Sequence, residues 1–99
     1  MVTDYNPTPI QTEHIVLRDE ILELVELLAE NAHDIWALER LRDGWTFGPK
    51  RDDLKRQHPC LIPYLQLPER ERDYDRTMVI ESIRAILALG FTISRAEPE

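Results

Sequence analysis

A long apolar stripe over residues 19–42 constrains the fold more than any other feature of the sequence. Large apolar side chains recur there with a period near 3.6 residues, and carboxylates occupy most of the opposite side. The stripe consists of Ile21, Leu24, Val25, Leu28, Ala32, Ile35, Trp36 and Leu38. A helix over about 20–42 would be roughly 34 Å long at ~1.5 Å per residue. Its whole stripe needs cover, and a second helix is the simplest cover.

Residues 74–89 predict that second helix. The segment contains no Gly or Pro, and its apolar residues recur at helical spacing: Val79, Ile80, Ile83, Ile86, Leu87 and Leu89. Caps are expected at Asp19 for the first helix and at Asp73 or Asp75 for the second, with ends at Gly44 and Gly90. Residues 67–71 predict a separate short helical turn that opens with Pro68. Residues 91–93 predict a short strand or an extended tail.

Size and charge limit the domain organisation and the classes of partner. The 99 residues allow one domain, which we place at 9–93, between a flexible arm over 1–8 and a frayed tail over 94–99. Ile10, Ile15, Val16 and Leu17 are expected to anchor the arm to the body. A core this small favours a partner subunit. The formal charge of −7 opposes binding to a nucleic-acid polymer, which requires a basic face.

The cysteine count and the apolar runs favour a cytoplasmic protein. Cys60 is the one cysteine, so the sequence cannot form an internal disulfide, as is usual in a reducing compartment. No apolar run approaches the ~18 residues typical of a membrane span. The first residues lack the basic start and the apolar run of a signal peptide. We therefore expect no membrane association.

The connection between the helices, residues 44–64, carries the one locally cationic patch of this acidic chain. Its basic residues are Lys50, Arg51, Lys55 and Arg56, which lie beside Asp52 and Asp53 and are flanked by Trp45, Phe47 and Tyr64. Aromatic faces beside cations suit a nucleotide, because rings stack on the base and cations bind phosphate. A structural role is the alternative. Asp52 or Asp53 would then cap a turn, Arg51 would pair with a carboxylate of the first helix, and Trp45 would close the core.

Nothing in the sequence indicates a catalytic or metal site. His58 and Cys60 lie two residues apart, but a zinc site needs three or four ligands, and no CxxC or HxxxH pattern is present. Glycine-rich phosphate-binding loops are also absent. We expect no cofactor, no metal and no enzymatic activity. His14 is expected to be a surface or packing residue, His33 a hydrogen-bonded structural residue and Trp36 a core residue.

Three segments of the sequence read LAENAHDIWALERLRDGWTFGPKRDDLKRQHPCLIPY, LPERERDYDR and AILALGF. They resemble the RyR domain, the repeat found in pairs in ryanodine receptor calcium channels and also as small bacterial proteins, and the resemblance covers roughly residues 9–93. It implies a mainly α fold, with two antiparallel helices over about 20–42 and 74–89, a long ordered proline-rich connection, and short strands or extended segments. Because the channel repeats associate in pairs, it also implies a homodimer for a single copy.

The resemblance further implies a non-catalytic module. One channel repeat pair is associated with adenine nucleotides, and bacterial members resemble sensors of nucleotide-derived ligands. We therefore expect a sensor or regulatory domain that binds a small nucleotide-like ligand. The candidate ligand-binding residues are Trp45, Arg51, Asp52, Asp53, Lys55, His58 and Tyr64. The alternative is a protein-interaction or structural module without a small-molecule ligand, whose protein partner the sequence does not identify.

Overall fold

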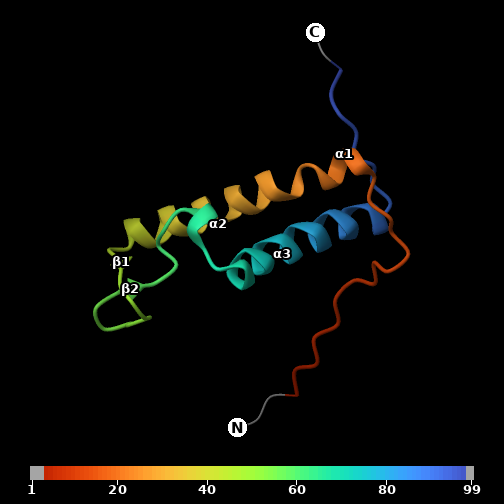
Figure 1. The fold of residues 1–99 in the computed structure, drawn as a ribbon. Coiled ribbons are helices and arrows are strands. Elements are labelled where there is room, and N and C mark those ends of the chain that lie inside the picture. Colours follow the sequence, from red (N-terminus) through yellow and green to blue (C-terminus); the bar gives the residue numbers. More distant parts are fainter. Residues whose placement is uncertain (1–3, 98–99) are drawn as a thin grey trace.

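The computed structural model describes residues 4–97 and consists mainly of two long helices (Figure 1). The elements follow in the order α1 (Asp19–Leu22), α2 (Val25–Arg42), β1 (Thr46–Phe47), β2 (Gln57–His58), the 3-10 turn η1 (Tyr64–Gln66) and α3 (Glu69–Ala88). The predicted mainly α fold with short strands is therefore confirmed. The flexible arm and the frayed tail expected at the ends fall partly outside the described residues, at 1–3 and 98–99.

The helix predicted over 20–42 is divided into α1 and α2 by a tightened turn at Glu23 and Leu24. The Leu24 N–H donates to the carbonyl of Ile21 at 3.0 Å, three residues back instead of four. Both turn residues keep right-handed helical backbone angles. The predicted N-cap was wrong by one residue, because Arg18 has the extended backbone of a cap and Asp19 is the first helical residue. Asp19 still places its carboxylate in the first turn, at the positive end of the helix dipole.

The helix ends predicted at Gly44 and Gly90 are confirmed. Both glycines have positive φ, 87° and 99°. The Gly44 N–H bonds to the Leu41 carbonyl at 3.0 Å, and the Trp45 N–H bonds to the Arg40 carbonyl at 2.9 Å. This pair of bonds is a Schellman motif. The same two-bond pattern occurs at the end of α3 around Gly90.

The second long helix, α3, begins five residues before the predicted start at Tyr74. The turn expected at residues 67–71 is its first turn, and Pro68 occupies the cap position. The Pro68 carbonyl accepts from the N–H groups of Glu71 and Arg72, at 2.9 and 3.2 Å. Proline restricts its own φ and needs no donor partner, so a helix can start immediately after it. Asp73 and Asp75 therefore lie inside α3 and do not cap it.

Helix α3 runs back along α2, so the contacts pair early residues of α1 and α2 with late residues of α3 (Figure 1). Ile21 packs with Ile83, and Glu26 pairs with Arg76. Six of the seven buried apolar residues among those described form two small clusters under these contacts. One consists of Leu17, Ile21 and Ile83, and the other of Ala29, Tyr64 and Leu67.

The N-terminal arm is anchored by fewer residues than expected. Leu17 is buried and Ile15 packs against the same cluster, but Ile10 and Val16 are exposed. A polar contact contributes instead, because the buried Thr12 hydroxyl donates to Glu81 of α3 at 2.7 Å. None of the helices in residues 4–97 is both long and apolar enough to cross a membrane.

The connection between the long helices is ordered by a very short parallel sheet. Thr46 and Phe47 of β1 pair with Gln57 and His58 of β2. Gly48, which follows β1, lies so close to Gln57 of β2 that a Cβ added to the glycine would be 2.6 Å from Cβ of Gln57. This sheet holds His58 near the end of α2. After α3, residues 91–93 form an extended tail, one of the two predicted outcomes.

Candidate ligand-binding site

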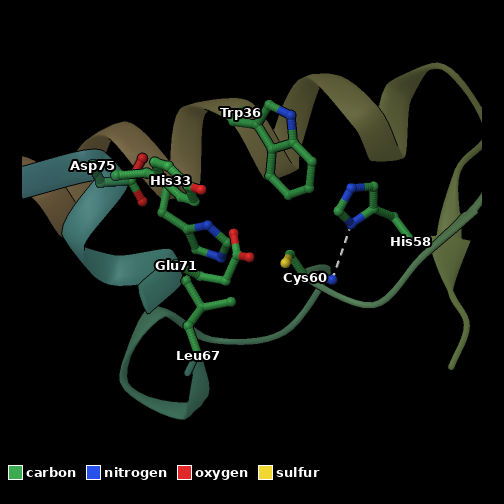
Figure 2. Close-up of a pocket in the computed structure, with 8 residues that line it drawn as sticks. His33, Trp36, His58, Cys60, Leu67, Glu71 and Asp75 are labelled. Atoms are coloured by element: carbon green, nitrogen blue, oxygen red, sulfur yellow. Dashed lines mark hydrogen bonds between the residues drawn. The ribbon is translucent and has the colours of Figure 1, made fainter. Parts of the chain in front are cut away.

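A cavity of about 220 Å³ lies between α2, α3 and the connection (Figure 2). Its lining comes from all three segments and comprises His33, Trp36, His58, Cys60, Leu67, Glu71, Tyr74 and Asp75. The volume is below the roughly 300–1,000 Å³ typical of sites for drug-sized ligands. The cavity is therefore suited to a planar group of a ligand whose remaining part lies outside it.

Aromatic rings form a continuous row along one wall of this cavity. The rings of His33 and Trp36 have centroids 5.6 Å apart, and Trp36 meets His58 edge to face at 5.0 Å. Trp45 extends the row outside the cavity, with its centroid 6.4 Å from that of His58. Such rings offer stacking surfaces to a flat ligand.

Hydrogen bonds set the tautomers of the two histidines. His33 is buried, and its Nε2–H donates to the carbonyl of Ile62 at 2.7 Å, which confirms the structural hydrogen bond expected for it. Nδ1 of His58 accepts from the Cys60 backbone N–H at 3.0 Å (Figure 2). Burial lowers the pKa of His58, and the charges of Arg51 and Arg40 lower it further. His58 is therefore neutral at neutral pH, with its proton on Nε2.

Two carboxylates from α3, Glu71 and Asp75, form the acidic part of the lining. Burial raises the pKa of Asp75, and the charge of Glu71 adds to this. Burial and the same two carboxylates raise the pKa of the Cys60 thiol. Cys60 is thus held as a thiol, the unreactive form of cysteine.

The raised pKa of Asp75 predicts a stability change on removing its charge. The stability that a protonated Asp75 contributes is fully present below its unfolded pKa, near 3.8, and is lost as the pH rises through the higher folded value. We therefore expect Asp75→Asn to raise the free energy of unfolding at neutral pH, by about 0.5 kcal/mol or more. Urea unfolding at neutral and at acidic pH measures this. An equal loss of stability at both pH values would contradict it.

Guanidinium groups lie at a different part of the site. Cζ of Arg40 lies 5.9 Å from the Trp36 ring centroid and 5.5 Å from that of Trp45. Cζ of Arg51 lies 6.0 Å from the Trp45 ring centroid. The acidic groups thus line the cavity, whereas two cations lie over Trp45 outside it, and one of them, Arg40, also lies over Trp36 of the lining. A ligand with a hydrogen-bond donor at one end and an anionic group at the other would match both parts.

The structure brings three of the sequence candidates together. His58 lines the cavity, Trp45 is next in the aromatic row, and Arg51 lies over Trp45. Arg51 also donates to Asp53 at 2.8 Å, instead of pairing with a carboxylate of the first helix.

The other four candidates, Asp52, Asp53, Lys55 and Tyr64, have local structural roles or lie apart. Asp52 accepts the backbone N–H of Lys55 at 3.0 Å and pairs by its backbone with Gln57, so it closes the turn that presents Arg51. Tyr64 does not line the cavity. It is 2% exposed, and its hydroxyl lies 3.4 Å from both carboxylate oxygens of Glu26.

The acidic lining and Tyr74 escaped prediction from the sequence. Residues 69–73 alternate acidic and basic side chains, which is typical of a solvent-exposed helix face whose charges pair with one another. The Arg72–Glu69 ion pair at 2.6 Å fits that interpretation. However, Glu71, Tyr74 and Asp75 are three and four residues apart and share one side of α3. That spacing is the signal that could have identified them. Trp36, expected in the core, is only partly buried and lines the cavity.

Two further observations bear on the class of site. Within residues 4–97, no three His, Cys, Asp or Glu side chains are grouped so that they could hold a metal ion. A comparison with models of protein families matches residues 5–95 to the RyR domain. The match covers nearly the whole chain.

Proposed function

This chain belongs to the RyR domain family, and we propose that it is a non-catalytic module that binds a small nucleotide-like ligand in the cavity between α2 and α3. One observation carries the proposal: an aromatic cavity with two carboxylates adjoins two guanidinium groups. The base would occupy the cavity, and the phosphate would lie outside it, near Trp45.

The lining of the cavity suits a nucleobase. Trp36 and His58 offer ring surfaces, and stacking of a base on an aromatic side chain contributes about 1–3 kcal/mol. The carboxylates of Glu71 and Asp75 accept hydrogen bonds, which the exocyclic amino group of a base can donate. The Nε2–H of His58 supplies a donor for a ring nitrogen. Both kinds of polar group on a base would then have partners.

The guanidinium groups suit the phosphate. Arginine binds phosphate oxygens through two parallel hydrogen bonds, so Arg40 and Arg51 are the residues expected to hold it. Arg51 now pairs with Asp53, but both side chains are mostly exposed. Exposed ion pairs contribute little free energy, so a phosphate can replace Asp53 as the partner. Lys55 lies on the same turn and adds positive charge.

The properties of Cys60 and His58 support a binding role over a catalytic role. A catalytic cysteine needs a lowered pKa and a base within hydrogen-bond reach of its sulfur. The pKa of Cys60 is raised instead. Nδ1 of His58 accepts the backbone N–H of Cys60 and is not available to its thiol.

Calorimetric titration with ADP, adenosine and ribose 5-phosphate tests this division of roles. We expect Arg51→Ala to weaken ADP binding roughly tenfold or more, since it removes a charge-assisted hydrogen bond, and to leave adenosine binding unchanged. Arg84→Ala is the control, because Arg84 also pairs with a nearby acid but belongs to α3 and is not one of the two arginines that lie over the tryptophan rings. Equal losses for ADP and adenosine would contradict the proposed phosphate contact.

A protein-interaction module is the second candidate. One observation favours it: Leu54 is 99% exposed at the turn between Arg51 and Lys55, and Phe47 is exposed nearby on β1. If ADP, ADP-ribose and cyclic dinucleotides all fail to bind at millimolar concentration, this candidate becomes the better one.

A further inference from the structure

The cavity between α2 and α3 has hydrogen-bond acceptors at one end and a donor at the other. The acceptors are the carboxylates of Glu71 and Asp75 on α3, and the donor is His58 on β2. Figure 2 shows Glu71 and His58 on opposite sides of Cys60, with the ring of Trp36 above the space between them. A flat ligand stacked on Trp36 would therefore present one edge to a carboxylate and another edge to an imidazole N–H.

We propose that the base held in this cavity is guanine in preference to adenine, and that Glu71 is the residue that selects it. The inference rests on the proposed function, because it concerns the base of the same nucleotide. The Watson–Crick edge of guanine has two adjacent donors, N1–H and the N2 amino group, and one carboxylate can accept both through its two oxygens. The other polar edge of guanine has the acceptors O6 and N7, which match the Nε2–H of His58.

Adenine matches this arrangement of donors and acceptors less well. It has one donor group, the N6 amino group, and the ring acceptors N1 and N7 flank it. A carboxylate that accepts from the amino group therefore brings its second oxygen against the lone pair of a ring nitrogen, and this repulsion opposes binding. Adenine keeps one hydrogen bond where guanine has two. Adenine nucleotides should therefore still bind, but more weakly.

Glu71 is the better placed of the two carboxylates for this contact. Burial raises the pKa of Asp75 and of the Cys60 thiol, and the charge of Glu71 adds to both shifts. The Glu71 carboxylate therefore lies close to both groups, where α3 meets the connection. The raised pKa also means that Asp75 takes up a proton more readily, which makes it a poorer acceptor than an ordinary carboxylate.

The donors that adenine would need beside the carboxylates are directed elsewhere. Ring nitrogen N1 of adenine requires an N–H or O–H partner, and an acceptor buried without one is costly. The Nε2–H of His33 is already bonded to the carbonyl of Ile62 at 2.7 Å. The indole nitrogen of Trp36 points away from Glu71 (Figure 2). Tyr74 is 57% exposed and lies at the rim of the cavity.

Calorimetric titration of the wild-type chain with GDP, IDP and ADP tests the preference. We expect GDP to bind roughly 5–150-fold more tightly than ADP, the discrimination that one two-bond contact to a base provides. IDP keeps N1–H but lacks the N2 amino group, so its affinity should lie between the other two.

Three results would overturn the guanine preference while leaving the proposed nucleotide function in place. They are equal binding of GDP and ADP, tighter binding of ADP, and equal binding of GDP and IDP. Failure of all three nucleotides to bind at millimolar concentration would overturn both proposals. Because this comparison uses the wild-type chain, it does not depend on the folding of any variant.

Glu71→Gln tests the residue assigned to the selection. The glutamine amide has one acceptor and one donor, which match the N6 amino group and N1 of adenine. We expect the dissociation constant for ADP divided by that for GDP to fall to about one or below. Glu39→Gln is the matched control, since it makes the same change at an exposed position of α2 that does not line the cavity. The control should keep the wild-type ratio. A wild-type ratio in Glu71→Gln, or the same change in both variants, would overturn the assignment to Glu71.

Discussion

Replacement of Tyr64 by alanine is expected to lower the free energy of unfolding by about 3–5 kcal/mol, the usual loss for a large aromatic residue removed from a core. Tyr64 is 2% exposed and packs with Ala29 and Leu67 in one of the two buried clusters. Its ring also lies 6.2 Å from that of His33. The substitution would leave a cavity beneath the connection, and urea unfolding measures the loss.

Tyr64→Phe separates the packing of this residue from its hydroxyl. The hydroxyl lies 3.4 Å from each oxygen of Glu26, which Arg76 also binds, so its bond is long and shared. We expect a loss of about 1 kcal/mol or less and unchanged ADP binding, because Tyr64 does not line the cavity. Near wild-type stability for Tyr64→Ala, or lost ADP binding for Tyr64→Phe, would place Tyr64 in the site instead.

The largest effect on binding is expected from Trp36→Leu. Trp36 lies centrally in the aromatic row, next to His33 and His58, and Arg40 lies over its ring. Leucine keeps an apolar side chain there but removes the stacking surface. A loss of about 1–3 kcal/mol of stacking corresponds to roughly 5–150-fold in affinity, for adenosine and ADP alike. Calorimetric titration of both ligands gives the two ratios.

Trp45→Leu is the matched comparison for Trp36→Leu. Trp45 lies outside the cavity and contacts Arg40 and Arg51, so its removal should weaken ADP binding more than adenosine binding. The sequence analysis named Trp45 among the candidate ligand-binding residues and expected Trp36 in the core, so a stacking role was assigned to Trp45 and not to Trp36. If Trp45→Leu abolishes adenosine binding while Trp36→Leu does not, that original assignment is correct and the cavity does not hold the base.

The parts of the fold that depend on local chemistry could be predicted from the sequence. Gly44 and Gly90 end the helices because each adopts a positive φ, which glycine tolerates best. The start of α3 was misplaced because Asp73 and Asp75 are good capping residues in isolation, whereas Pro68 starts the helix earlier. The apolar stripe of α2 was treated as one buried face. Helical periodicity shows which residues share a side of the helix, but it does not show which of these residues a neighbouring element covers.

The site could be predicted only in part, because its lining comes from segments far apart in the sequence. His58 and Trp45 lie in a distinctive segment and were identified. Glu71 and Asp75 belong to a strongly charged run, and such runs are usually solvated. Only the return of α3 along α2 places them beside His33. Tyr64 shows the opposite error. The sequence placed it among the candidate ligand-binding residues because it is aromatic and lies near basic residues, but its side chain is buried in the core.

Ligand binding in the cavity is tested most directly by NMR of the three histidine rings during titration with ADP, ADP-ribose and a cyclic dinucleotide. His33 and His58 line the cavity, whereas His14 is exposed in the N-terminal arm and serves as an internal reference. We predict that the ring signals of His33 and His58 shift in a saturable manner with at least one of these ligands, while those of His14 do not change. Unchanged His33 and His58 signals at millimolar concentrations of all three, or equal shifts of all three rings, would contradict binding in this cavity.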